Sequence, residues 1–204
     1  MSRLPEHFYQ STDVVAVAKN LIGKKLVSNL GGDITSGIIT ETEAYHQSEK
    51  ACHAYNGRYT PRTRTLFEPG GFTYVYLCYG IHCLLNVTTG TCGEAAAVLI
   101  RAIQPVDGLS KMLKRRQMMK KHPGITDGPG KLTKAMGVTL ADNGKSIVDG
   151  SELWIEEYLD HKTLHIGTST RIGVAYAGSD ALLPWRFFLN DNKWVSKAKT
   201  IKFF

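Results

Sequence analysis

Two short segments carry side chains whose types and spacing could do chemistry. Residues 41–45 read Glu-Thr-Glu-Ala-Tyr, so the carboxylate of Glu43 stands two residues before the ring of Tyr45. Residues 73–80 are rich in tyrosine, and Tyr79 precedes a glycine at their end. A carboxylate can serve as a general base, rings can cage another flat ring, and a protruding ring can enter a base stack. These groups suit an enzyme that acts on a nucleobase outside its duplex.

The first of these segments follows a predicted pair of strands. Residues 26–28 and 36–43 read as strands, and a Gly-Gly-Asp turn separates them. This pattern places Glu43 at or just past the end of the second strand, where its side chain can face a cleft.

The second segment predicts a β-hairpin. Residues 72–78 and 81–89 both read as strands, and only Tyr79 and Gly80 stand between them, which indicates a two-residue turn. Tyrosine is not a residue that turn chemistry favours at a hairpin tip. We therefore expect the Tyr79 ring to project from the molecule.

The remaining pattern is rich in strands, with few helices and short connections. We expect an opening helix at 11–22, a long loop at 46–71, a buried strand at 95–102, a basic amphipathic helix at 106–121, a short helix that begins near Gly128, and strands at 153–158, 171–176 and 185–189. The sequence therefore predicts a single α+β domain over residues 1–204. Its sheet should be curved, mostly antiparallel and open-barrel-like, with flanking helices and a protruding β-hairpin.

Composition narrows the class of partner. The chain has 204 residues and a formal net charge of +7, which favours polyanions such as nucleic acid. Its N-terminus lacks the apolar run of a signal peptide, and no segment is long enough to span a bilayer. We therefore expect a cytoplasmic protein, nucleoid-associated if bacterial and not secreted, with no membrane contact.

The four cysteines argue against a metal centre. Cys52, His53, His82 and Cys83 could be imagined as zinc ligands, but adjacent residues on a strand point to opposite faces. No CxxC pair is present, so reduced thiols that pack as small apolar residues are the favoured reading. We expect neither a metal nor a cofactor.

Several ordered blocks resemble the alkyladenine (3-methyladenine, or methylpurine) DNA glycosylases of the mammalian type. The resemblance runs from about residue 4 to residue 197. The blocks that carry it are 41–45, Arg58-Tyr59-Thr60-Pro61-Arg62-Thr63-Arg64, 74–80, Leu85-Asn86, Leu99-Ile100-Arg101-Ala102, Gly128-Pro129-Gly130-Lys131-Leu132 and Arg171-Ile172-Gly173-Val174. It implies a base-excision-repair enzyme that hydrolyses the N-glycosidic bond of flipped-out alkylated purines such as 3-methyladenine, acting as a monomer on damaged double-stranded DNA.

The resemblance also implies a role for individual residues. Glu43 would activate the attacking water, and Arg101 would orient Glu43 or the adjacent phosphate. Tyr79 would be the wedge that fills the gap in the base stack. The base pocket would comprise Tyr45, His53, Tyr76 and Asn86, with Asn86 excluding the exocyclic amine of guanine.

Two further expectations concern strand cleavage and DNA phosphates. The sequence has no lysine where a Schiff-base nucleophile is expected, so the enzyme should be monofunctional and leave the strand intact. The candidates for binding the DNA backbone are the loop arginines and one helix-start lysine, namely Arg58, Arg62, Arg64 and Lys131.

Two other classes of function compete with this interpretation. One is a catalytically silent protein that binds damaged DNA through the same basic surface and Tyr79. The other is a metal-dependent hydrolase built on His53, His82 and the cysteines. Considered singly, Glu43 could also be a solubilising strand-end residue, and Tyr45 and Tyr76 could be core aromatics.

Overall fold

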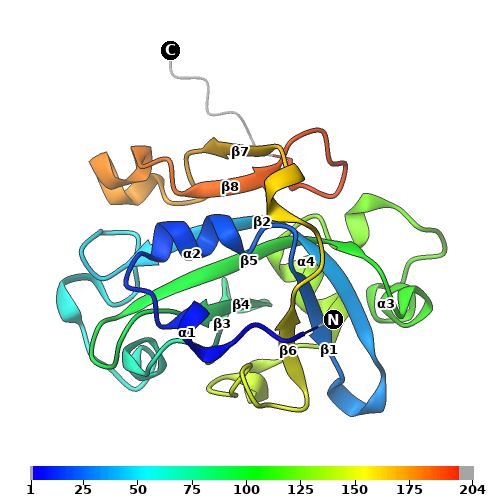
Figure 1. Cartoon of the computed structure of the whole chain (residues 1–204), viewed down its shortest axis with the longest axis horizontal. Coiled ribbons are helices and arrows are strands. Elements are labelled where there is room, and N and C mark those ends of the chain that lie inside the picture. The colour runs from blue at the N-terminus through cyan, green and yellow to red at the C-terminus, as the bar shows by residue number, and fades with distance from the viewer. Residues whose placement is uncertain (1, 198–204) are drawn as a thin grey trace.

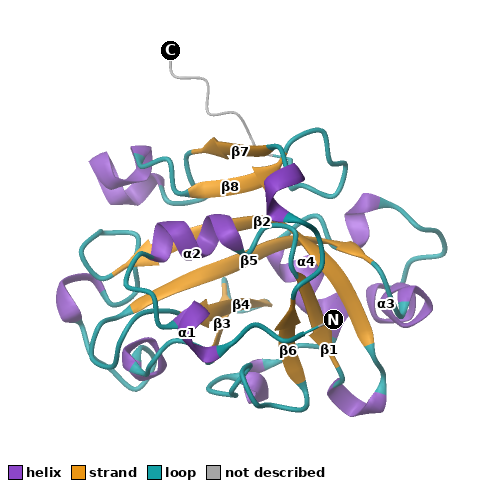
Figure 2. Ribbon diagram, in the orientation of Figure 1, coloured by secondary structure: helices purple, strands orange, loops and turns teal. Residues whose placement is uncertain are grey.

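The computed structural model describes residues 2–197 and is built around one strongly curved antiparallel sheet. The strand order is β3-β4-β5-β2-β1-β6, and β8 joins the edge of β2 with β7 outside it. The strand bounds are β1 Lys25–Ser28, β2 Thr35–His46, β3 Thr73–Cys78, β4 His82–Thr88, β5 Ala96–Pro105, β6 Leu153–Glu156, β7 Ile166–Ser169 and β8 Arg186–Leu189. Figures 1 and 2 show this sheet with short helices around it. The expected α+β class and curved sheet are confirmed.

Residues 2–197 contain four α-helices. They are α1 Glu6–Tyr9, α2 Val14–Asn20, α3 Leu109–Arg116 and α4 Pro129–Met136. Of these, α2, α3 and α4 pack against the sheet. The Asp13 side chain accepts a hydrogen bond from the Ala16 N–H and so caps the start of α2. In Figure 1, α2 lies across β2 and β5, where the Thr42 hydroxyl donates to the Ala18 carbonyl at 2.8 Å. None of the helices described is long and apolar enough to cross a membrane.

Strand β2 is the centre of the fold because it has three partners. β5 pairs along one edge, while β1 and then β8 share the other. Two register shifts interrupt the β2–β5 ladder, and they leave Thr40 and Arg101 without a paired partner across it. Such bulges bend a strand and re-aim a side chain, and they are common beside active sites. Glu41, Glu43 and Tyr45 alternate with Thr42 and Ala44, and this period of two gives them the face opposite α2.

The sequence predicted most elements within a few residues, with clear exceptions. No strand forms at 171–176, which is a turn followed by a 3-10 helix, whereas a strand that was not predicted forms at Ile166–Ser169. The basic helix is shorter than 106–121 because Gln117 adopts a left-handed conformation and ends it. The loop at 46–71 contains two 3-10 turns.

Candidate active site

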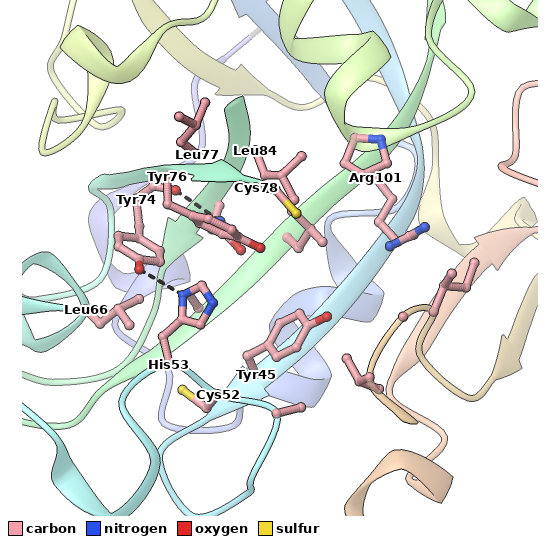
Figure 3. Close-up of a pocket in the computed structure, with 18 of the residues that line it drawn as sticks. Tyr45, Cys52, His53, Leu66, Tyr74, Tyr76, Leu77, Cys78, Leu84 and Arg101 are labelled. Carbon is pink, nitrogen blue, oxygen red and sulfur yellow. Dashed lines mark hydrogen bonds between the residues drawn. The ribbon is translucent and has the colours of Figure 1, made fainter. Parts of the chain in front are cut away.

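A cavity of about 560 Å³ opens between the β3–β4 hairpin, the end of β2 and the segment after residue 171. Its walls include seven residues singled out from the sequence, namely Tyr45, His53, Arg62, Tyr76, Tyr79, Asn86 and Arg101. Figure 3 shows the rings of Tyr45, His53 and Tyr76 around a common space, with the Arg101 guanidinium on the side of the Tyr45 hydroxyl.

One wall of the cavity is a cluster of three rings. His53 meets Tyr76 edge to face, with ring centroids 4.5 Å apart and planes at 78°. His53 Nδ1 is 2.9 Å from the Tyr74 hydroxyl, so Tyr74 fixes the orientation of the imidazole. Sequence reasoning gave Tyr74 no role. The alternation along β3 could have identified Tyr74, because it puts Tyr74 on the same face as Tyr76.

The floor of the cavity is built by the register of the hairpin. Asn86 lies opposite Tyr74 in the β3–β4 ladder, and its Nδ2 donates to the Tyr74 carbonyl at 3.0 Å. The Asn86 side chain is buried, and this bond holds the amide in one orientation at the cavity surface.

The opposite wall is Tyr45, which rests on a buried arginine. The Arg171 guanidinium lies 4.8 Å from the centre of the Tyr45 ring and 5.2 Å from that of Trp185. Arg171 binds both carboxylate oxygens of Glu49 at 2.8 and 2.9 Å. Neither Arg171 nor Glu49 was predicted to have a role here. Residue 171 belonged to a block noted for resemblance, but the strand predicted over it was wrong.

The sequence had suggested that Glu43 ends its strand, but the structure places Glu43 inside β2. Its side chain is fully buried, because Leu99 of β5 and Arg186 of β8 flank it in the sheet. The interior around it is nevertheless polar. Glu43 Oε2 accepts from the Tyr45 hydroxyl at 2.7 Å and from Arg101 Nη1 at 3.1 Å, and its Oε1 accepts from the Ile172 N–H at 2.7 Å.

The carboxylate of Glu43 is therefore one hydrogen bond away from the cavity. All three of its donors belong to residues that line the cavity, namely Tyr45, Arg101 and Ile172. An ionised carboxylate offers about four acceptor positions. Three are filled, which leaves one for a water molecule or another donor.

The hairpin presents Tyr79 as the sequence predicted. The ring is 88% exposed. Tyr79 and Gly80 have φ values of 51° and 72°, the pattern of a type I′ turn, although strand pairing resumes only at His82. The left-handed conformation costs a non-glycine residue about 1 kcal/mol or more, and strain of this kind clusters at functional positions.

The four predicted phosphate-binding residues differ in their ion pairing. Arg58, Arg62 and Arg64 are exposed, and none forms an ion pair with any residue between 2 and 197. Arg62 reaches into the cavity mouth, with its guanidinium 5.3 Å from the centre of the Tyr76 ring. Lys131 is paired with Asp127 at 2.7 Å.

A second hollow of about 760 Å³ lies across the hairpin from the first. Tyr79 lines both hollows. Three cations line the second one, namely Arg116, Lys131 and Lys134. Two of them had no role in the sequence analysis. The exposed tip of the hairpin therefore stands between an aromatic cavity and a basic one.

The imidazole of His53 should stay neutral to unusually low pH. Burial, with the Arg62 charge as the second cause, lowers the pKa of His53 to about 4. In the unfolded chain the value is about 6.5, so the unfolded state takes up this proton first as pH falls. His53 should therefore reduce the free energy of unfolding as pH drops from about 6.5 to 4.

An NMR titration of the His53 ring should give a midpoint near 4. The variant His53→Phe should lose this part of the pH dependence of stability. A midpoint close to the ordinary value, about 6.5, would contradict the burial described here.

Residues 2–197 contain no group of three His, Cys, Asp or Glu side chains placed to hold a metal ion. Cys52, Cys78, Cys83 and Cys92 are free thiols.

Comparison with known proteins gives consistent results. Residues 7–193 match the family model described as methylpurine-DNA glycosylase. A relative from Chlamydia pneumoniae is 46% identical over 92% of this chain and 95% of its own length. Relatives from Carboxydothermus hydrogenoformans and Clostridium botulinum are 44% and 42% identical over 95% of this chain and 98% of theirs. All three bear the name "Putative 3-methyladenine DNA glycosylase". Because these relatives are bacterial, they lend no support to the mammalian type.

Proposed function

The chain belongs to the methylpurine-DNA glycosylase family, whose members are DNA-repair hydrolases of N-glycosyl bonds, and we propose that it excises flipped-out alkylated purines by means of a water activated by Glu43. The observation that carries this proposal is the placement of Glu43. It is a carboxylate with one acceptor position open, directly behind a cavity walled by electron-rich rings.

The reaction requires the nucleotide to leave the stack, because its glycosidic bond is out of reach inside the duplex. The flipped purine would lie between Tyr45 on one side and His53 and Tyr76 on the other. A purine alkylated at N3 or N7 is cationic, and a desolvated cation gains up to about 2 kcal/mol from an aromatic face. An undamaged purine gains none of this, which gives the cavity a physical basis for selection.

Hydrolysis then needs a base more than an acid. Glu43 takes a proton from the water as the water oxygen attacks C1′ of the sugar, and the bonding electrons leave with the purine. The cationic base departs as a neutral molecule, so it needs no strong general acid. The negative charge of Glu43 also stabilises the oxocarbenium-like sugar, as in inverting glycosidases. Arg101 would hold Glu43 in the orientation that the attack requires.

The other residues would select the base and hold the DNA. Asn86, fixed by the Tyr74 carbonyl, would clash with the exocyclic amine of guanine. Arg58, Arg62, Arg64 and Lys131 would bind phosphates, with the second hollow extending the basic surface. Lysine is absent from the cavity walls in the described chain, so no Schiff base should form and the strand should stay intact.

Duplex oligonucleotides that each carry one defined lesion provide the test. The purified protein should release the free base from at least one alkylated purine, and the strand should break only after alkali. Binding to damaged duplex without release of any base would overturn the proposal and favour a silent DNA-binding protein.

Removal of the Tyr79 ring should separate recognition of damage from folding. The variant Tyr79→Asn keeps a residue that favours the turn conformation, so its stability should match or slightly exceed that of the parent. Its affinity for lesion-containing duplex should fall by about 5- to 150-fold, since stacking on one base contributes roughly 1–3 kcal/mol. Fluorescence titrations on damaged and undamaged duplex would measure this.

The exposed Met119, which lines neither hollow, provides the control as Met119→Asn. It should leave both affinities unchanged. Equal preference for damaged duplex in Tyr79→Asn and the parent would remove Tyr79 from its proposed role.

A further inference from the structure

Glu43 is one end of a buried ladder of charges that the proposed reaction does not by itself explain. Arg101 Nη1 donates to Glu43, while Arg101 Nε donates to Glu41 Oε1 at 2.8 Å. Arg186 Nε donates to the same oxygen of Glu41 at 2.7 Å. Both carboxylates are fully buried, and both guanidiniums are nearly so. The charges therefore alternate across β2, β5 and β8 and sum to zero.

Ser196 closes this ladder from the C-terminal side. Its N–H donates to Glu41 Oε2 and its hydroxyl to Glu41 Oε1, both at 2.7 Å. Its carbonyl accepts from Arg186 Nη2 at 3.3 Å. The segment is anchored nearby, because Trp194 is buried and its carbonyl accepts from the Thr40 hydroxyl at 2.9 Å.

The two carboxylates differ in their access to the cavity. Glu41 accepts four hydrogen bonds, three at Oε1 from Arg101, Arg186 and the Ser196 hydroxyl and one at Oε2 from the Ser196 N–H. Of these donors only Arg101 lines the cavity, whereas all three donors to Glu43 do. Glu41 is therefore placed to hold Arg101, although it lies two residues from Glu43 on the same strand face.

We propose that Glu41, held by Ser196, is a positioning residue that fixes Arg101 and offsets its charge, and thereby keeps Glu43 in the orientation that the reaction requires. This inference rests on the proposed function of Glu43. Without Glu41, the buried guanidiniums of Arg101 and Arg186 would leave an excess of positive charge beside Glu43. Arg101 would also lose the bond to Nε that prevents its rotation.

The protonation state of Glu41 supports this role. Burial alone would raise the pKa of the Glu41 carboxyl, but the Arg101 and Arg186 guanidiniums outweigh it and hold the pKa below its usual range. Glu41 therefore carries its charge across the neutral range. The ionisable groups near Glu43 come from four elements. They are Arg101 from β5, Arg171 from the loop after β7, Arg186 from β8, and Glu41 and Tyr45 from β2.

The test is the rate of base release from methylated duplex DNA under single-turnover conditions. Glu41→Gln should lower the rate by about tenfold or more, since misplacing a reacting group by about 1 Å can cost on the order of 10²-fold. DNA affinity should stay unchanged. Glu6→Gln, an exposed carboxylate on α1, is the matched control and should change neither rate nor affinity.

Ser196→Ala covers the case in which Glu41→Gln fails to fold. It keeps the N–H bond to Glu41 and loses the hydroxyl bond to Glu41 and the longer bond, 3.5 Å, that the hydroxyl accepts from Arg101 Nη2, so a smaller loss of rate is expected. A folded variant with the parental rate would overturn the proposal.

A second measurement separates this proposal from the proposed function. The Arg101 Nε–H signal in ¹⁵N NMR should exchange slowly with solvent in the parent and faster in both variants. If the parent released no base at all, the proposed function would fail, while this exchange rate would still decide whether Glu41 and Ser196 position Arg101. Unchanged exchange in the variants would refute the positioning role.

Discussion

Glu43→Gln should reduce base release from methylated duplex DNA by roughly 10²- to 10⁴-fold, the range typical for loss of a general base. The amide has the shape of the carboxylate, and its oxygen can still accept from the Ile172 N–H. Its NH₂ group would instead face the Arg101 Nη1 donor, and it cannot take a proton from water. Single-turnover rates with enzyme in excess would measure the chemical step apart from product release.

The same variant should bind lesion-containing duplex with nearly parental affinity, because Glu43 lies behind the cavity wall and not in it. A thermal melt must accompany the assay, since Arg101 then faces an amide in a buried site. A rate within twofold to threefold of the parent, with binding intact, would exclude Glu43 as the base.

Arg171→Met should destabilise the protein by about 3–5 kcal/mol, the usual result of breaking a buried ion pair from one side. The Arg171 side chain is fully buried and Glu49 is 3% exposed. Besides Glu49, Arg171 donates to the carbonyls of Ala44 and Asp180, and methionine would leave these acceptors unpaired as well. Urea denaturation at neutral pH would report the free energy of unfolding.

Two comparisons sharpen this measurement. Removing the charge from both partners, in Arg171→Met with Glu49→Gln, should recover part of the loss because no uncompensated carboxylate stays buried. Lys111→Met breaks an ion pair with Asp33 at the surface and should shift the unfolding midpoint far less. If Arg171→Met were as mild as Lys111→Met, Arg171 would not be the buried support of Tyr45 described here.

The sequence predicted the parts of the fold that depend on local rules. The β3–β4 hairpin follows from strand alternation around Tyr79 and Gly80, and α2 follows from its apolar stripe and the Asp13 cap. The prediction failed where the extent of a strand depends on pairing with segments far away in the sequence. β2 continues to His46 because β5 pairs with its last three residues, while β8, far along the chain, pairs with residues 41–43.

The same distinction between local pattern and contacts with distant segments holds for the candidate site. The rings and Glu43 lie in short segments, and alternation along a strand places them on one face. The support of these residues comes from elsewhere: Ile172 donates to Glu43 through its backbone, which no side-chain pattern reveals. Arg171 lies in a segment that alternates like a strand but forms a turn, because its guanidinium is drawn inward to Glu49.

The pairing of β8 with β2 has a consequence for how the protein is made. Glu43 is synthesised early, whereas its Ile172 partner and β8 follow more than a hundred residues later. A polypeptide still emerging from the ribosome, or one cut by a protease before residue 171, would lack both the Ile172 donor to Glu43 and the Arg171 support of the Tyr45 ring. Such fragments should be unable to remove bases from the genome. Two fragments divided in the 157–165 connection should regain activity only when they reassemble.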